Sequence, residues 1–150
     1  PPMSLVGYSY PMNILYNQTT ALWERFMPER HQIEDRIGTH VYSVQRYPEN
    51  YFADFNPVLF FEKWAAVEVP DGAIIPEGFT GITIEAGLYA VFEHKGPVGS
   101  LEAIQYIFDQ WLPRSRYRLA ERPHFERLPE DYMAQGDQAE EIIYIPIDPR

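Results

Sequence analysis

Segments rich in apolar, β-branched and aromatic residues recur along this chain and are separated by prolines and glycines. Such segments are typical of β-strands, because proline and glycine continue a strand poorly and favour turns. The pattern predicts strands at residues 3–10, 40–47, 60–69, 82–94, 123–128 and 140–147. The fourth predicted strand contains a break at Gly87.

Two other segments have apolar residues three or four positions apart, as on one face of a helix. The first spans residues 20–38, with an interruption at Pro28 and an apolar stripe that continues through Ile33 and Ile37. The second opens at Pro97, where the missing N–H costs little in the first turn of a helix. Its apolar face consists of Leu101, Ile104, Ile107, Phe108 and Trp111.

The sequence also repeats itself. Three strings return in the same order: Phe26-Met27-Pro28 as Trp111-Leu112-Pro113, Arg46-Tyr47-Pro48-Glu49-Asn50 as Arg127-Leu128-Pro129-Glu130-Asp131, and Val67-Glu68-Val69-Pro70 as Ile143-Tyr144-Ile145-Pro146. The separations fall from 85 to 81 to 76 residues, as expected if the second copy has shorter loops. This repeat is longer than the roughly 20–50 residues of solenoid units.

The repeat predicts an α+β fold of two strand-helix-strand-strand modules related by a pseudo-twofold axis. Module one covers about residues 1–72 and module two about residues 82–150, joined by the glycine- and proline-rich segment 71–81. We expect a crevice between the modules, which is a common place for small-molecule sites.

A length of 150 residues fits one domain, and 45% hydrophobic residues can form a real core. No apolar stretch approaches the roughly 18 residues of a membrane span, and no signal-peptide pattern begins the chain. The absence of cysteine fits a reducing compartment. We therefore expect a soluble cytoplasmic protein that does not associate with membranes.

The formal net charge of −10 changes the range of expected partners. It repels phosphate backbones, so direct nucleic-acid binding is not expected, and it attracts cations. Aromatic residues reach 15%, enough to line a ligand site, although core packing and solubility explain the same numbers. The four histidines lack the tight spacing of a zinc site, and no phosphate-loop pattern occurs. Neither a metal nor a cofactor is expected.

Strand parity selects the candidate site residues, because alternate side chains share a face. Glu126 and Leu128 share one face of the strand 123–128, and the repeat places Gln45 and Tyr47 at the matching positions of module one. In the last strand of each module, Glu68 matches Tyr144.

Trp64 shares the face of Glu68, and Ile142 shares the face of Tyr144. If these faces line one crevice, the ligand-binding set is Glu126, Tyr144, Glu68, Trp64, Tyr47, Leu128 and Ile142. Two carboxylates with aromatic neighbours suit a lipophilic cation, through ion pairing and cation–π contact. Solvated strand faces for the glutamates and core packing for the aromatics are the alternative interpretations.

Several strings together resemble the GyrI-like small-molecule-binding family, which also supplies the effector-binding domain of some AraC- and MerR-type transcription regulators. These strings are Trp64-Ala65-Ala66-Val67-Glu68-Val69, Gly87-Leu88-Tyr89-Ala90-Val91-Phe92-Glu93-His94-Lys95-Gly96, Trp111-Leu112-Pro113, His124-Phe125-Glu126-Arg127 and Glu141-Ile142-Ile143-Tyr144-Ile145-Pro146. The resemblance covers nearly the whole chain. It implies a curved antiparallel sheet, two main helices and a ligand cleft between the modules.

The resemblance also implies hydrophobic, often cationic, ligands whose charge meets a buried glutamate. Glu126 fits the position of this glutamate, and Tyr144 fits that of a tyrosine on the last strand that lines the cleft. Three functions follow. The first is a stand-alone sensor, buffer or sequestrant of such compounds. The second is a hydrolase of cyclopropanoid electrophiles, in which Glu126 activates water and Tyr144 assists.

The third function is a protein partner of DNA gyrase or of a regulator, since an acidic surface can mimic DNA. The 150 residues leave no room for a DNA-binding domain, so we expect the chain not to be a complete regulator by itself.

Overall fold

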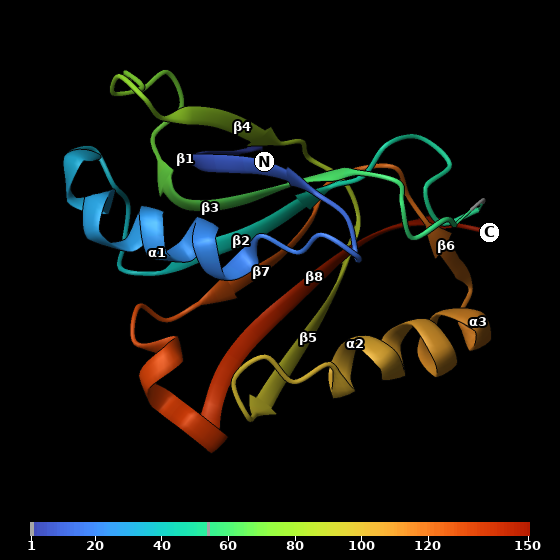
Figure 1. Cartoon of the computed structure of the whole chain (residues 1–150). Helices are drawn as coiled ribbons and strands as arrows, with labels where there is room; N and C mark the ends of the chain where they lie inside the picture. Colours follow the sequence, from blue (N-terminus) through green and yellow to red (C-terminus); the bar gives the residue numbers. More distant parts are fainter. Residues whose placement is uncertain (1, 54) are drawn as a thin grey trace.

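A computed structural model of the chain describes residues 2–53 and 55–150. Within these residues, eight β-strands form one curved, wholly antiparallel sheet (Figure 1). The strands are β1 (Met3–Met12), β2 (Val41–Arg46), β3 (Phe61–Val69), β4 (Thr80–Ile84), β5 (Tyr89–Gly96), β6 (Tyr117–Leu119), β7 (His124–Leu128) and β8 (Ala139–Pro149). The α+β class and the curved antiparallel sheet expected from the sequence are confirmed.

The order of the strands in the sheet is symmetric about its centre. The main path runs β4-β1-β3-β2-β7-β8-β5, and β6 pairs with the end of β8. The order β1-β3-β2 on one side is mirrored by β5-β8-β7 on the other, and β2 pairs with β7 between them. This arrangement places two strand-helix-strand-strand units side by side.

The break predicted at Gly87 separates two strands that lie far apart. Residues 85–88 connect β4 to β5, and these strands occupy opposite ends of the main path. β4 pairs with β1, although the sequence places Ile82 at the start of the second module. β6 is a strand that the sequence pattern did not predict, because it comprises only three residues.

The helical segments are α1 (Thr19–Glu29), α2 (Glu102–Tyr106) and α3 (Leu112–Arg114). A π-helical turn at residues 107–111 joins α2 to α3, so the predicted second helix is one continuous helical segment. It begins at Glu102, five residues after Pro97. None of the described helices is both long and apolar enough to cross a bilayer.

The predicted extension of the first helix to residue 38 is wrong. After α1, residues 30–32 form a 3₁₀ turn, and Ile33 is already extended. The N–H of Ile37 then donates to the carbonyl of Glu68, so the backbone here pairs with the end of β3. Ile33 is still buried under α1, which explains why its spacing matched a helical stripe.

Two layers of core residues cover the two faces of the sheet. One face carries α1 and α2, with Val67 and Phe26 in the core under α1 and Ile143 and Ile107 in the core under α2. We call this side the helix face. The opposite face carries a separate cluster around Trp64, Tyr42, Val44 and Phe125. The central strands β2 and β7 lie between the two helices (Figure 1).

Candidate functional site

The structure divides the seven predicted site residues between the two faces of the sheet. Glu126 and Leu128 lie on the helix face, and Tyr47 follows β2 and contacts the helix-face ring of His124. The other four lie on the opposite face: Trp64, Glu68, Tyr144 and Ile142. The expectation that all seven converge on one crevice is therefore wrong.

The physical reason lies in the register between β7 and β8. Glu126 is directly opposite Ile143, so these two side chains share a face. Ile142 and Tyr144, on either side of Ile143, therefore point to the other face. Parity within a strand is fixed by sequence, but the register between strands is set by contacts distant in sequence.

The register also corrects the match between Glu68 and Tyr144. If Gln45 is the counterpart of Glu126, then Val44 is the counterpart of Phe125. Val44 lies opposite Trp64, whereas Phe125 lies opposite Tyr144. A twofold axis that relates Gln45 to Glu126 therefore relates Trp64 to Tyr144. The sequence repeat instead matches Glu68 with Tyr144, so one axis cannot account for both matches.

A polar cluster lies on the helix face where the two halves meet. Lys63 of β3 is opposite Gln45 of β2, and Gln45 is opposite His124 of β7. Two residues away along the same two strands, Ser43 is opposite Glu126. Gln45 Nε2 donates to Ser43 Oγ at 2.9 Å and lies 3.5 Å from Glu126 Oε1. We call Lys63, Gln45, Ser43, His124 and Glu126 the central cluster.

Burial perturbs the ionisation of the central cluster. Loss of solvent raises the pKa of Glu126 to about 7, against the opposing charge of Lys63 and the Gln45 hydrogen bond. Burial also lowers the pKa of Lys63, although Glu126 favours its charged form, and lowers the pKa of His124 to about 4. A half-buried carboxyl group and a half-buried amine thus lie on one face of the sheet with a buried, neutral imidazole. Such perturbed groups often mark functional sites.

A second acidic group lies on the same face of β8. Glu141 is two residues from Ile143, and its Oε1 lies 3.3 Å from His94 Nδ1 of β5. Burial raises the pKa of Glu141, while His94 opposes the shift, and the Glu141 charge adds to the rise in the pKa of Glu126. The helix face therefore holds two carboxylates, although the second is not the Glu68 that the sequence suggested.

Aromatic rings border the central cluster. The ring centroid of Tyr47 lies 4.9 Å from that of His124 and 5.1 Å from that of Phe61. Phe52, from the β2–β3 connection, stacks on His124 at 5.4 Å and on Phe108 of the second helical segment at 5.6 Å. We call Tyr47, Phe52, Phe61 and Phe108 the aromatic wall. It links the two halves beside the buried charges.

A hollow of about 380 Å³ shares residues with both features, since Tyr47, Phe52 and His124 are among those that line it. This volume lies within the range of small-molecule pockets. Glu126 is not among its lining residues. Another hollow, of about 520 Å³, includes His94 and Glu141.

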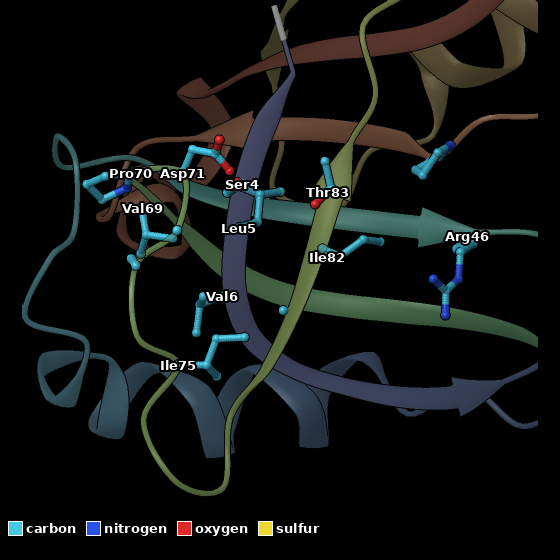
Figure 2. Close-up of a pocket in the computed structure, with 14 residues that line it drawn as sticks. Ser4, Leu5, Val6, Arg46, Val69, Pro70, Asp71, Ile75, Ile82 and Thr83 are labelled. Carbon is cyan, nitrogen blue, oxygen red and sulfur yellow. The ribbon is translucent and has the colours of Figure 1, made fainter.

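A hollow of about 600 Å³ lies away from this chemistry. Figure 2 shows it beside β1 and β4, with Leu5 and Ile82 on these neighbouring strands and Ile75 on the loop that connects β3 to β4. Its labelled charged residues are Asp71 and Arg46, and Arg46 stands apart from the others (Figure 2). No member of the central cluster lines it, so we place the candidate site at the central cluster instead.

Sequence reasoning missed several members of this site. Lys63 carried a usable signal, because it sits at an alternating position of an apolar strand whose Ala65 and Val67 are buried. His124 also carried a signal, because it lies two residues from Glu126 on the same strand and therefore shares its face, but it was not among the predicted site residues. Phe52 and Phe108 carried no such signal, because only the folded chain brings the β2–β3 connection to the second helix.

A curved sheet with helices on one face, and partly buried ionisable groups beside aromatic rings, is the arrangement expected of a small-molecule-binding domain. Comparison with known families supports this class. The family model described as "integron-associated effector binding protein" matches residues 1–147, and the chain belongs to this family. The resemblance to GyrI-like proteins is thereby confirmed.

Three relatives illustrate the similarity. The transcriptional regulator BrlR of Pseudomonas aeruginosa is 29% identical over 150 residues, which are 98% of this chain and 53% of BrlR. This chain therefore spans about half the length of BrlR. SAV2435, solved bound to tetraphenylphosphonium, is similar with a TM-score of 0.71 and 16% identity, over 98% of this chain and 89% of SAV2435.

The third relative is an integron cassette protein from the mobile metagenome of Vibrio cholerae. It is similar with a TM-score of 0.67 and 15% identity, over 98% of this chain and 91% of the cassette protein. At these identities, the similarity of this chain to the two solved structures shows a shared fold.

Proposed function

We propose that this chain binds lipophilic organic cations on the helix face, with the carboxylate of Glu126 as the counter-charge. The observation that carries the proposal is the half-buried Glu126 of the central cluster, held beside the aromatic wall. Of the residues expected from the sequence, Glu126 and Tyr47 form the core of the proposed site, and Leu128 adjoins it on β7. Trp64, Glu68, Tyr144 and Ile142 are left outside it.

The physical chemistry favours a cationic ligand. Burial makes the ionised carboxylate of Glu126 costly, so a ligand cation that neutralises it recovers part of that cost. Aromatic faces add cation–π attraction of about 0.5–2 kcal/mol for each well-placed ring. The net charge of −10 also draws cations toward the protein.

The relatives support the same class of ligand. SAV2435 was solved bound to tetraphenylphosphonium, a bulky permanent cation. The family description names effector binding, and BrlR is a transcriptional regulator. We propose that ligand binding serves sensing or sequestration in the cytoplasm, and that any protein partner is a regulator.

A hydrolytic function is the second candidate, because a carboxyl with a pKa of about 7 is well matched to accept a proton from water near neutrality. In this case Glu126→Gln abolishes turnover of a cyclopropanoid electrophile while binding of the intact compound survives. Equal turnover by the variant and the wild type would exclude Glu126 as the base.

Titration with tetraphenylphosphonium in a calorimeter tests the binding proposal. We expect Glu126→Gln to weaken binding at least about tenfold, because the ligand charge loses its buried counter-ion. Glu140→Gln is the matched control, since it removes the same charge from an exposed pair with Lys95. Equal affinity of Glu126→Gln and wild type would refute the assignment. A tenfold loss in Glu140→Gln would reduce it to an effect of net charge.

A further inference from the structure

We propose that Lys63 makes the site selective for aromatic zwitterions, that is, for ligands that carry an anionic group as well as a cation. This inference rests on the proposed function and names the ligand class for the same site. The chain has two lysines: Lys63 lies on the helix face in the central cluster, whereas Lys95 is exposed.

The sheet register fixes how the two charges are arranged. Lys63 on β3 and Glu126 on β7 share the helix face, with β2 between them. Two strand spacings across the sheet and an offset of two residues along β7 separate their backbones by about 12 Å. Gln45, opposite Lys63 on the intervening strand, turns its amide toward Glu126. The two charged groups therefore flank Gln45.

Neither charge is fully compensated within the protein. Six ion pairs occur among the described residues, and neither Lys63 nor Glu126 belongs to one. Their mutual attraction does not offset the loss of solvent, since the pKa of each is shifted toward its neutral form. Each group therefore gains from an opposite charge that a ligand brings.

A simple cation satisfies only half of this arrangement. It neutralises Glu126 but approaches the amine of Lys63, and the same buried environment strengthens that repulsion. A ligand with a carboxylate at a distance from its cation meets Lys63 and Glu126 together. It also holds Lys63 in the ammonium form.

The aromatic wall suggests what joins the two ligand charges. Phe61 precedes Lys63 by two residues on the same face of β3, and the ring centroid of Tyr47 lies 5.1 Å from that of Phe61. Tyr47 also contacts His124, which precedes Glu126 by two residues on β7. Aromatic rings thus border the central cluster on one side, which favours a flat aromatic body as the group that joins the two ligand charges.

Two dyes provide a matched test. Rhodamine 110 is zwitterionic, and rhodamine 123 is its methyl ester, with the same aromatic cation but no carboxylate. Fluorescence anisotropy at pH 7.5 gives the Kd of each dye for the full chain. The preference is the Kd of rhodamine 123 divided by that of rhodamine 110.

We expect the wild type to prefer rhodamine 110, and Lys63→Met to lower the preference at least about tenfold. Lys95→Met is the matched control and leaves the preference unchanged, while Lys63→Arg retains it because the positive charge stays. Circular dichroism and a thermal melt establish that each variant is folded.

An unchanged preference in folded Lys63→Met, or a wild type that prefers rhodamine 123, would overturn the role of Lys63. Failure of the proposed function looks different. In that case Glu126→Gln binds rhodamine 123 as tightly as the wild type does, whatever Lys63 contributes. If the wild type binds neither dye, both proposals are wrong.

Discussion

The raised pKa of Glu126 makes a quantitative prediction for the pH dependence of cation binding. A permanent cation such as tetraphenylphosphonium does not titrate, so any change in its affinity reports on the protein. With a pKa of about 7, Glu126 is ionised in about 10% of molecules at pH 6 and about 90% at pH 8. If only the ionised form binds the cation, the affinity rises about tenfold over this interval.

Affinity increases as pH rises through 7 and then levels off, because the carboxylate has become fully ionised. The lowered pKa of Lys63 acts in the same direction at higher pH, since its neutral form repels a cation less. The pKa of Glu141 is also raised, so its ionisation again favours the cation as pH rises.

Calorimetric titrations from pH 5.5 to 8.5 measure this dependence, with Glu126→Gln as the control. The variant keeps Lys63 and Glu141 and loses the step near pH 7. A wild-type affinity that stays constant between pH 6 and pH 8 would show that Glu126 has an ordinary pKa or lies outside the site. An affinity that falls with pH would contradict the electrostatic reasoning altogether.

Three further predictions concern stability and the division of the site between faces. Since the folded-state pKa of Glu126 lies above the usual 4.5, the free energy of unfolding falls as pH rises from about 4.5 to 7. In urea melts, Glu126→Gln therefore stabilises the free protein at pH 8 by at most about 3 kcal/mol and does not stabilise it at pH 4. Because Glu68 and Tyr144 lie on the opposite face, Glu68→Gln and Tyr144→Phe keep the tetraphenylphosphonium Kd within about twofold; a tenfold loss in either would return the opposite face to the site. Gly7→Ala destabilises the fold by about 3 kcal/mol in the same melts, because an added Cβ lies 1.9 Å from the carbonyl oxygen of Ala65; an unchanged melt would mean that β1 and β3 separate freely.

The local features of this fold could be predicted from sequence because particular residues terminate its elements. Pro48, Pro70 and Pro129 each follow the end of a strand within two residues, as the pattern required. The apolar stripe of the second helix predicted a helical segment that does pack its Ile107 into the core. The paired order of strands, helices and strands predicted a sheet of two matching halves.

The composition of the site could not be predicted in the same way, because it depends on register. A shift of one residue between β7 and β8 would place Tyr144 beside Glu126 and move Ile143 away. That choice is made by the burial of Ile143 and Ile145 under the second helix, which no single strand encodes. Lys63 likewise becomes meaningful only once Gln45 and Glu126 lie next to it on neighbouring strands.

The central claim is that the helix face, and not the opposite face, receives the ligand charge at Glu126. A crystal structure of the complex with tetraphenylphosphonium tests this claim most directly. We predict that the phosphonium lies between α1 and α2, with a phenyl ring against Tyr47 or Phe52 and Glu126 as the nearest carboxylate. A phosphonium seated on the opposite face, against Trp64 and Tyr144, would contradict it.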